Sequence, residues 1–550
     1  MASTTIPPDK FLFYDTETSG LDHTAHIGQY GAIMTDPDFN EIERVERLCL
    51  QRSDVIPAVP AYLTHKIKLS RMMDEGKFEP EFFEDIKSDM MKDRNTCVVG
   101  YNSMKFDDER VRESFFRTNK DPYEREWKNG NSRFDVFKMV KAVYALKRDA
   151  IEWPTKEDGS LSMQLEKIAP LNGIKQTRAH DAMSDVEATI GVMKLVKDKE
   201  PQFFDYCLKL RNKAFVGNIV DKKCFLMVGE SLSKDREYSA IMMPLVDHPQ
   251  NKNSKICLDV ARCTDDMINE MISTDPSEIR DRVYRGEKSE RFPLAEVKMN
   301  QLPFVFTPAL LKNDLELQKR LDIDYESDTK RVQELGNDQR IADLMRVVGE
   351  AYNTKPPAKE DVYGQIYNGF IDRTDRSKID SMSINNYSAW EKIANSVSDS
   401  RISPLTIRMV GNINTEFLSD DGKEEFENWM KERYNDETGK YGMTLVEFWY
   451  DVENARKNEE LTSEDMEIIK ELDDHVQYFA NNYAPEMVNN KEMKVAEFRE
   501  KKEQERLEYE ERMKELEASK DLKSPEPLED ESEKKTKIKK KKEKGNDLNI

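Results

Sequence analysis

A short apolar run that ends in acidic residues constrains the fold of this chain more than any other segment. The run FLFY (residues 11–14) is followed by Asp15, Thr16 and Glu17, and then by Thr18-Ser19-Gly20. Side chains alternate between the two faces of a strand, so Asp15 and Glu17 would share one face and Thr16 would point the other way. A D-x-E pair alone is common on exposed strands, but the apolar run before it favours a buried strand with two carboxylates at its end.

Residues 1–200 alternate between strand-like and helix-like segments. Apolar and β-branched runs bounded by turn residues predict strands at 11–15, 27–36, 46–51 and 96–102. Apolar residues at helical spacing predict helices at 107–116, 134–146, 162–171 and 181–199. Asp181 is the expected N-cap of the last helix, and Gly173 the expected end of the helix before it. This alternation predicts an α/β domain.

The remaining 350 residues change character three times, as expected for a 550-residue chain of three or four domains. Residues 201–350 hold short strands with turn residues between them, at 224–229, 238–246, 255–261, 292–300 and 303–306, and a helical insert near 265–286, which predicts a small β-barrel or sandwich. Residues 355–485 follow a proline-containing linker and are mostly amphipathic helix, with helices predicted at 426–434, 445–456 and 463–483. Residues 486–550 begin as an almost wholly charged helix and end in eight lysines and one glutamate between Lys534 and Lys544, where we expect disorder.

Two further acidic segments of the α/β domain are candidate site residues. Asp107 lies after the strand VVGYN at the start of a predicted helix, where a carboxylate is electrostatically favoured in any case. A metal ligand and an N-cap are therefore equally good interpretations of Asp107, and Asp108 competes for the second role. His180 and Asp185 are more discriminating, because they lie just before and one turn inside the helix capped by Asp181.

These carboxylates are suited to hard cations. Magnesium takes oxygen ligands, and a two-metal site holds its ions roughly 4 Å apart with three or four carboxylates from separate elements. His180 could then take a proton from a metal-bound water. His65, in YLTHKI, could line a nucleotide pocket or equally be a histidine of a surface loop.

Composition excludes several classes of protein. A net charge of −22 argues against a general polyanion binder, although a single basic groove could still contact nucleic acid. No stretch approaches the roughly 20 apolar residues of a membrane helix, and MASTTIPPDK does not have the pattern of a secretory signal. The six cysteines form no C-x-x-C pair, which favours reduced thiols in a cytoplasmic protein.

The order D-x-E, then N-x-x-x-F-D, then H-x-x-x-x-D resembles the DEDDh exonucleases. The phrases GYNSMKFDDE, NSRFDVFKMVKAVYAL and AHDAMSDVEATIGVMKLVK are similar to bacterial exonuclease I, and so are PLVDHPQNKNSKICLDVA and QIYNGF in the later regions. The resemblance covers residues 10–485. It implies an RNase H-like exonuclease domain (1–200), an SH3-like β-barrel domain (201–350), a helical domain (355–485) and a charged tail (486–550).

The resemblance also implies an activity. Members of this family remove nucleotides from the 3′ end of single-stranded DNA in repair and recombination, and they release 5′-monophosphates with magnesium, for which manganese can substitute. The implied metal ligands are Asp15, Glu17, Asp107 and Asp185, with His180 as general base. The implied substrate contacts are Glu17, Thr16, Thr18 and His65.

Further family properties concern the other domains and a partner. The SH3-like and helical domains would enclose the DNA strand and so raise processivity. The implied protein partner is single-stranded DNA-binding protein. Its acidic C-terminal tail would bind near basic residues of this chain such as Lys147. We expect a monomer.

The chain departs from the family pattern in three places. The usual basic R-x-R-N-F-P stretch of the helical domain reads NINTEFL (Asn412 to Leu418), so phosphate contacts would be lost or moved. Gln164 stands where a basic residue is common. The tail beyond residue 486 has no counterpart in the family, and its lysine block is either a solvated tail or a binding segment for nucleic acid or acidic partners.

Two alternative functions stay open at this point. One is another DEDDh enzyme, either an exoribonuclease or a polymerase proofreading exonuclease, although these commonly consist of the nuclease domain alone. The other is a nucleic-acid-binding scaffold without activity, which the presence of all five site residues disfavours.

Overall fold

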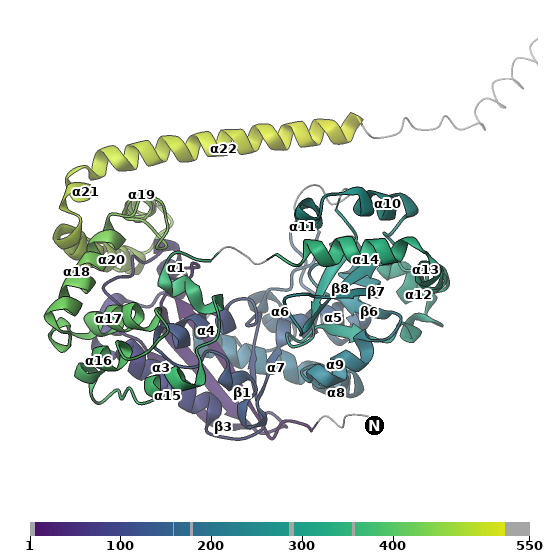
Figure 1. Ribbon diagram of the computed structural model, residues 1–550, viewed down its shortest axis with the longest axis horizontal. Helices are drawn as coiled ribbons and strands as arrows, with labels where there is room; N and C mark the ends of the chain where they lie inside the picture. Colours follow the sequence, from purple (N-terminus) through teal and green to yellow (C-terminus); the bar gives the residue numbers. More distant parts are fainter. Residues whose placement is uncertain (1–5, 158, 177–179, 285–290, 355–357, 523–550) are drawn as a thin grey trace, which may run out of the picture. The chain divides into compact units, whose positions relative to one another are not determined.

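The computed structural model (Figure 1) describes residues 6–157, 159–176, 180–284, 291–354 and 358–522. The chain divides into two compact units, residues 1–485 and residues 486–550. The lysine block at 534–544 lies outside the described residues, so the expected disorder there stays a prediction.

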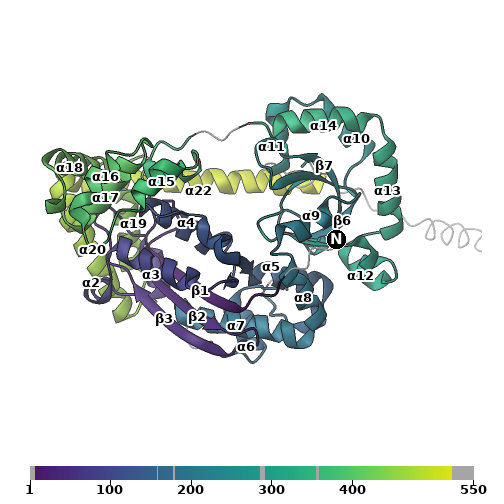
Figure 2. The same ribbon diagram turned by 60° about the horizontal axis from the view of Figure 1, so that its bottom comes forward.

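A five-stranded sheet is the centre of the first domain (Figure 2), with the strand order β3-β2-β1-β4-β5. Its strands are β1 (Lys10–Thr18), β2 (Ile27–Thr35), β3 (Glu41–Leu48), β4 (Thr96–Gly100) and β5 (Ser132–Asp135). β1 pairs antiparallel with β2 and parallel with β4. The carboxyl ends of β1 and β4 therefore lie at the same edge of the sheet, where Asp15 and Glu17 lie near the end of β1 and Asp107 follows β4.

Both faces of this sheet are covered by helices, which explains why FLFY is apolar at every position. Phe11 and Phe13 pack in one hydrophobic cluster with residues of α5 and α7, whereas Leu12 and Tyr14 pack in another with residues of α3 and α4. The helices of this region are α1 (Val59–His65), α2 (Leu69–Glu75), α3 (Glu79–Met91), α4 (Asp107–Arg117), α5 (Val136–Leu146), α6 (Leu165–Leu171), α7 (Ala182–Lys199), α8 (Pro201–Lys209) and α9 (Lys213–Val220).

The fold confirms the expected alternation but corrects it at β3 and β5. β3 spans residues 41–48 rather than 46–51, because it pairs with residues 29–35 of β2 and ends with Leu48 opposite Gln29. The helix expected from residue 134 begins at Val136, because Phe134 and Asp135 pair with Val99 and Gly100 of β4. This pairing makes β5, a strand that the sequence pattern did not indicate.

The helix α7 lies close against the sheet and begins as expected. Asp181 is its N-cap, with a side chain that accepts from the Ser184 N–H at 3.2 Å. A Cβ atom added to Gly31 of β2 would lie only 3.0 Å from the backbone of Ala182 and Met183. The glycine therefore permits the close approach that places the first turn of α7, and with it Asp185, beside the sheet.

The second domain contains a five-stranded antiparallel sheet with the order β10-β6-β7-β8-β9. Its strands are β6 (Phe225–Val228), β7 (Ser239–Asp247), β8 (Ser254–Asp259), β9 (Leu294–Lys298) and β10 (Phe304–Phe306). All five occupy segments predicted as strands, and the expected insert forms α10 (Asp265–Ser273) and α11 (Pro276–Tyr284). Three helices complete the domain: α12 (Leu315–Leu321), α13 (Tyr325–Asn337) and α14 (Arg340–Ala351).

The third domain is helical, as predicted. It contains α15 (Arg373–Ile379), α16 (Trp390–Ala394), α17 (Ile402–Ile413), α18 (Asp420–Tyr434), α19 (Leu445–Arg456) and α20 (Ser463–Tyr483). Capping boxes fix the starts of α19, at Thr444 and Glu447, and of α20, at Thr462 and Asp465. α21 (Pro485–Asn489) follows.

This helical domain docks on the exonuclease domain around the buried Asp54, which is 2% exposed. Tyr363 Oη and Trp429 Nε1 donate to Asp54 Oδ2 at 2.7 and 3.2 Å, and Arg433 Nε donates to its carbonyl oxygen at 3.0 Å. Asn412 belongs to the stretch that departs from the family pattern, and its Oδ1 accepts from Ser53 N and Oγ at 2.8 and 2.7 Å. Asn412 thus contributes a contact between the two domains.

The second unit contains α22 (Lys491–Leu522), a helix of 32 residues. Its exposed surface carries ion pairs at helical spacing, such as Arg506 with Glu503 and Glu510 at 2.6 Å. The expectation of a charged helix in this segment is confirmed.

Candidate active site

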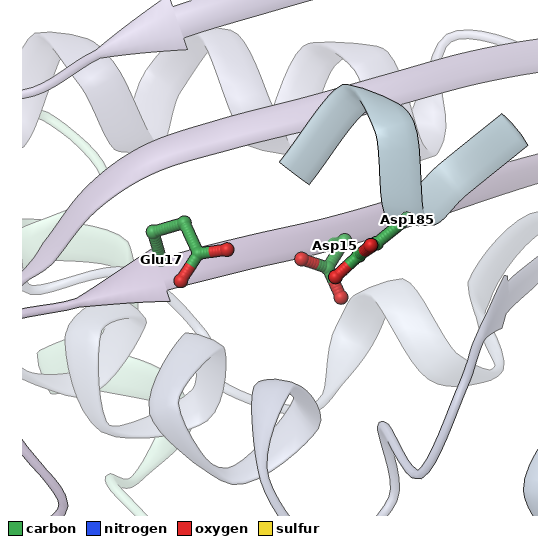
Figure 3. A group of neighbouring side chains, drawn as sticks. All are labelled: Asp15, Glu17 and Asp185. Carbon is green, nitrogen blue, oxygen red and sulfur yellow. The ribbon is translucent and has the colours of Figure 1, made fainter. Parts of the chain in front are cut away.

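The carboxyl end of β1 and the first turn of α7 bring three carboxylates together. Asp15 and Glu17 lie on one face of β1, and Asp185 lies on α7, which packs against β1 and β2. One oxygen atom of each carboxylate lies within 4.8 Å of the other two (Figure 3). Such a cluster of hard oxygen ligands fits a divalent cation, because carboxylates supply the negative charge that the ion needs.

These residues line a cavity of about 580 Å³. Asp107 and His180, the other two expected site residues, are also in its wall. Lys234 and Tyr238 of the second domain line it as well, so two domains build one cavity. All five residues of the acidic pattern, Asp15, Glu17, Asp107, His180 and Asp185, therefore line one cavity.

Asp107 reaches the cavity from the N-terminus of α4. Its Oδ1 accepts from the Thr16 N–H at 3.1 Å and from Thr16 Oγ1 at 2.5 Å, so Thr16 ties α4 to the acidic strand. The N-cap position of α4 is occupied by Phe106, without a side-chain cap among the described residues. Of the two interpretations of Asp107, the structure therefore disfavours the N-cap.

The electrostatics of the cavity are those of a site that has an excess of negative charge. Burial raises the pKa of Asp15 well above its usual range, and the neighbouring Asp107, Glu17 and Asp185 add to the rise. Burial also raises the pKa of Asp107 to about 7 and raises that of Asp185. Carboxylates that raise one another's pKa are mutually destabilising when ionised, and a bound cation would remove this repulsion.

His180 and Asp185 are linked by a hydrogen bond between the His180 main chain and the Asp185 carboxylate. His180 is exposed, has a φ of 61° and hydrogen-bonds through its main chain to Asp185. Gln176 Nε2 donates to Asp185 Oδ1 at 2.6 Å. These contacts orient the Asp185 carboxylate toward the cavity and place the imidazole at its rim.

Only two of the four expected substrate contacts lie in the wall of this cavity. Glu17 and Thr16 line the cavity, whereas Thr18 is buried and donates to the Gly20 carbonyl at 2.9 Å. His65 is the last residue of α1, is 4% exposed and accepts from the Ile67 N–H at 3.0 Å. Neither Thr18 nor His65 is among the described residues that line this cavity, and the surface-loop interpretation of His65 is wrong.

Three residues near the cavity were missed by sequence reasoning. Asp135 is the N-cap of α5, and its carboxylate accepts from the Asn102 and Met104 N–H groups at 2.9 and 3.1 Å. It thereby holds the loop that leads to Asp107. Phe137 and Lys141 line the cavity, with Lys141 Nζ 3.9 Å from the centre of the Phe137 ring. The sequence signal for Asp135 would have been an aspartate directly before the apolar helical run VFKMVKAV, the position of an N-cap.

Three family models match the chain. They are described as Exonuclease (residues 12–193), Exonuclease I SH3-like domain (211–352) and Exonuclease I C-terminal domain (360–479). The chain belongs to the bacterial exonuclease I family. As a member of this family it is an enzyme, a nuclease that hydrolyses phosphodiester bonds.

The similarity to exonuclease I extends through most of the chain. Exodeoxyribonuclease I of Haemophilus influenzae is 34% identical over an alignment of 382 residues that covers 67% of this chain and 79% of that protein. The crystal structure of Escherichia coli exonuclease I with a dA16 oligonucleotide is 27% identical, with a TM-score of 0.77 over 86% of this chain and 100% of that one.

Two related structures contain further ligands. One is the zinc ion bound form of the E. coli exonuclease I complex with single-stranded DNA, with a TM-score of 0.76, 27% identity and coverage of 86% and 100%. The other is an ExoI/SSB-Ct complex, with a TM-score of 0.74, 27% identity and coverage of 86% and 99%. Among the described helices of the present chain, none has the length and apolar content required to span a membrane.

Proposed function

We propose that this protein is a 3′→5′ exonuclease specific for single-stranded DNA, which releases 5′-mononucleotides and acts in DNA repair and recombination. The observation that carries the proposal is the approach of Asp15, Glu17 and Asp185 to within 4.8 Å in the wall of a cavity. The binding of oligonucleotides by the related E. coli enzyme supports the choice of substrate.

The residues present fit divalent cations, because the carboxylates of Asp15, Glu17, Asp107 and Asp185 line one cavity, and the pKa values of Asp15, Asp107 and Asp185 are raised there. Asp15, Glu17 and Asp185 would hold the ions, and Asp107 would complete the set by giving up part of its contact with Thr16. We propose two magnesium ions, with manganese as a substitute. Such ions, when bound, activate water and neutralise charge on the phosphate.

Side chains of the protein would supply the proton transfer and hold the metal ligands and the substrate in position. His180, exposed at the rim, would accept the proton of the attacking water at an imidazole nitrogen. Thr16 would hold Asp107 in place, and Glu17 together with the Thr16 backbone would contact the terminal nucleotide. Gln176 would keep the Asp185 carboxylate oriented through the reaction.

The substrate phosphates require positive charge on the wall opposite the carboxylates. Lys141 and Lys156 of the exonuclease domain and Lys234 of the second domain line the cavity and are suited to this role. Gln164 lines it as well, at the position where related enzymes commonly have a basic residue. We propose that the second and third domains enclose the strand and thereby raise processivity.

The test is release of mononucleotides from single-stranded DNA and RNA labelled at the 3′ end, with magnesium and with EDTA. We expect release from DNA with magnesium, and loss of release when the terminal 3′ linkage is a phosphorothioate. Release from RNA but not DNA would support an exoribonuclease instead. Tight binding without release would support a scaffold and contradict the proposal.

A cavity of about 760 Å³ near Lys147 is the proposed contact for the acidic tail of single-stranded DNA-binding protein. Its basic lining residues are Lys147, Arg148, Lys319 and Arg320, and it is also lined by the acidic Asp149, Glu200, Asp314 and Glu316 and by apolar Leu146 and Leu317. The combination suits an acidic peptide with an apolar end, and the existence of an ExoI/SSB-Ct complex supports it.

The partner proposal is tested with a fluorescent peptide of that tail. We expect Arg320→Glu to weaken peptide binding at least tenfold and to leave release from a short oligonucleotide unchanged. The control is Arg346→Glu on α14, because this arginine is 59% exposed and outside the cavity. Equal binding by both variants would exclude this surface.

The proposed setting is the cytoplasm, with the protein acting as a monomer. All six cysteines lie within the described residues as free thiols, which suits a reducing compartment. Size-exclusion chromatography with light scattering would test the monomer.

A further inference from the structure

A second cavity, of about 430 Å³, lies between the exonuclease and helical domains. The exonuclease domain contributes residues 50–53, Met73 and residues 78–80, and the helical domain contributes parts of α17 and α20. It shares no described lining residue with the active-site cavity. Its volume is in the range of small-molecule sites in proteins.

The walls of this cavity are mainly apolar, and two of its large apolar side chains are exposed. Leu50, Phe78 and Met409 line it, together with the half-buried Phe479. Met73 from one domain is 53% exposed, and Tyr478 from the other is 64% exposed. Large apolar side chains exposed beside an apolar cavity are typical of a place where another molecule binds.

Two buried polar atoms in the wall lack partners among the described residues. Gln51 is 7% exposed, and its Oε1 accepts from Tyr62 Oη at 2.8 Å, whereas its Nε2 donates to none of the described groups. His475 Nε2 is likewise buried without a partner in the described part of the chain. Buried polar atoms are nearly always hydrogen-bonded, so an unsatisfied amide in a cavity wall indicates a missing acceptor.

The charge of the wall limits what kind of molecule would bind. Arg52 Nη1 and Glu79 Oε1 line the cavity but lie 3.0 Å apart as an ion pair. Burial lowers the pKa of His475 to about 4, so the imidazole is neutral at pH 7. The wall therefore has no unpaired charge among these groups, and a charged ligand would gain little from it.

We propose that this cavity is a binding site for an uncharged, planar heteroaromatic molecule of the nucleobase class. Such a molecule would place its rings between Tyr478, Phe479 and the methionines, and a ring nitrogen or carbonyl acceptor against Gln51 Nε2. A neutral His475 can donate or accept at Nε2, which matches the mixed hydrogen-bonding edge of a base. The inference goes beyond the proposed exonuclease reaction and does not rest on it.

Binding here would also stabilise the docking of the two domains, because the ligand would contact both. A ligand that binds the folded state alone raises the unfolding temperature with its concentration. The contact between the two domains is therefore expected to become more stable as more of the ligand is bound.

The test uses the full chain and the fluorescent adenosine analogue 2-aminopurine riboside, with EDTA present. We expect saturable quenching, a rise in unfolding temperature, and similar affinity for the riboside and its 5′-monophosphate. Gln51→Leu should weaken binding at least tenfold. The matched control Gln477→Leu, on the same helix as His475 but outside the cavity wall, should bind like the unaltered chain.

Two further variants keep the result interpretable. Ile413→Trp is expected to fill the cavity from α17 while Gln51 itself is kept, and it should abolish binding even if Gln51→Leu folds poorly. Asp15→Asn alters the active site and should leave binding unchanged. Absence of saturable binding, or binding lost in Asp15→Asn but kept in Ile413→Trp, would overturn the proposal.

Discussion

Asp107 and Asp108 are consecutive residues of α4, yet their buried carboxylates have opposite surroundings. Asp108 accepts from Arg125 Nη2 at 2.7 Å, from Arg133 Nη1 at 2.6 Å and from Tyr14 Oη at 2.6 Å. Burial disfavours its charge, but Arg133 and Arg125 outweigh this and hold its pKa well below the usual range. Asp107 faces the cavity and other carboxylates, and its pKa is raised to about 7. The first residue is part of the site, and the second is part of the structure that supports it.

The matched pair Asp107→Asn and Asp108→Asn should separate these roles. Asp107→Asn keeps an acceptor for Thr16 but loses a charge for cations, so we expect at least a roughly 100-fold loss of cleavage, with an unfolding temperature in EDTA equal to or above that of the unaltered chain. Asp108→Asn leaves two buried arginines without their anion and should cost about 3–5 kcal/mol in unfolding free energy. Kinetics with calorimetry on both variants checks this, and equal effects on stability would contradict it.

Asp15→Ala and Asp185→Ala should each abolish cleavage while the fold stays intact. Each change removes one oxygen ligand from the cluster of three, and each also relieves repulsion between buried carboxylates. We therefore expect unfolding temperatures in EDTA equal to or above that of the unaltered chain. Asp198→Ala, an exposed residue of the same helix as Asp185, is the control for activity. Full activity in either site variant would refute the metal assignment.

The stability of the metal-free protein should depend on pH through Asp107. Its pKa is raised in the folded state from 3.8 to about 7, so between these values the folded state binds more protons than the unfolded state. Unfolding free energy from this site therefore falls as pH rises from about 4 to about 7, by at most about 4 kcal/mol.

Denaturation in EDTA across this range, for the unaltered chain and Asp107→Asn, isolates the contribution of Asp107. The slope should be smaller in the variant, and smaller in the unaltered chain when magnesium is added. Identical slopes in both proteins would show that Asp107 does not titrate in this range.

Asp54→Ala should destabilise the docking of the helical domain. The change removes the acceptor of Tyr363 and Trp429 and leaves Arg52, 2.9 Å from Asp54, with one anion fewer. We expect a loss of about 3–5 kcal/mol in unfolding free energy. Asp38→Ala, whose side chain is 80% exposed beside Lys197, should cost less than about 1 kcal/mol. Chemical denaturation of the two variants tests the difference.

Deletion of residues 486–550 should leave the basic exonuclease step intact. Every described residue of the carboxylate cluster and of the cavity that contains it lies before residue 486. Turnover on a short oligonucleotide should therefore stay within about twofold of the full chain, since none of these lining residues is removed. A large loss of turnover after this truncation would show that the tail takes part in the reaction.

The sequence indicated elements best where the signal is local. The helices at 445–456 and 463–483 match their predicted bounds, because each begins with a capping threonine and continues with amphipathic spacing. β5 was missed, since its four residues become a strand only through pairing with β4. The bounds of β3 were shifted for the same reason, because pairing with residues 29–35 of β2 decides where β3 begins and ends.

The sequence by itself determined the order of the acidic residues, the helix that presents Asp185 and the face that Asp15 shares with Glu17, because these depend on periodicity within one element. Only the tertiary structure decided that Asp107 faces the cavity while Asp108 is enclosed by arginines, that His65 is buried, and that Asn412 joins two domains. Each of these outcomes depends on a partner far away in the chain, and a side chain's own neighbours in sequence carry no information about the distant group it will meet.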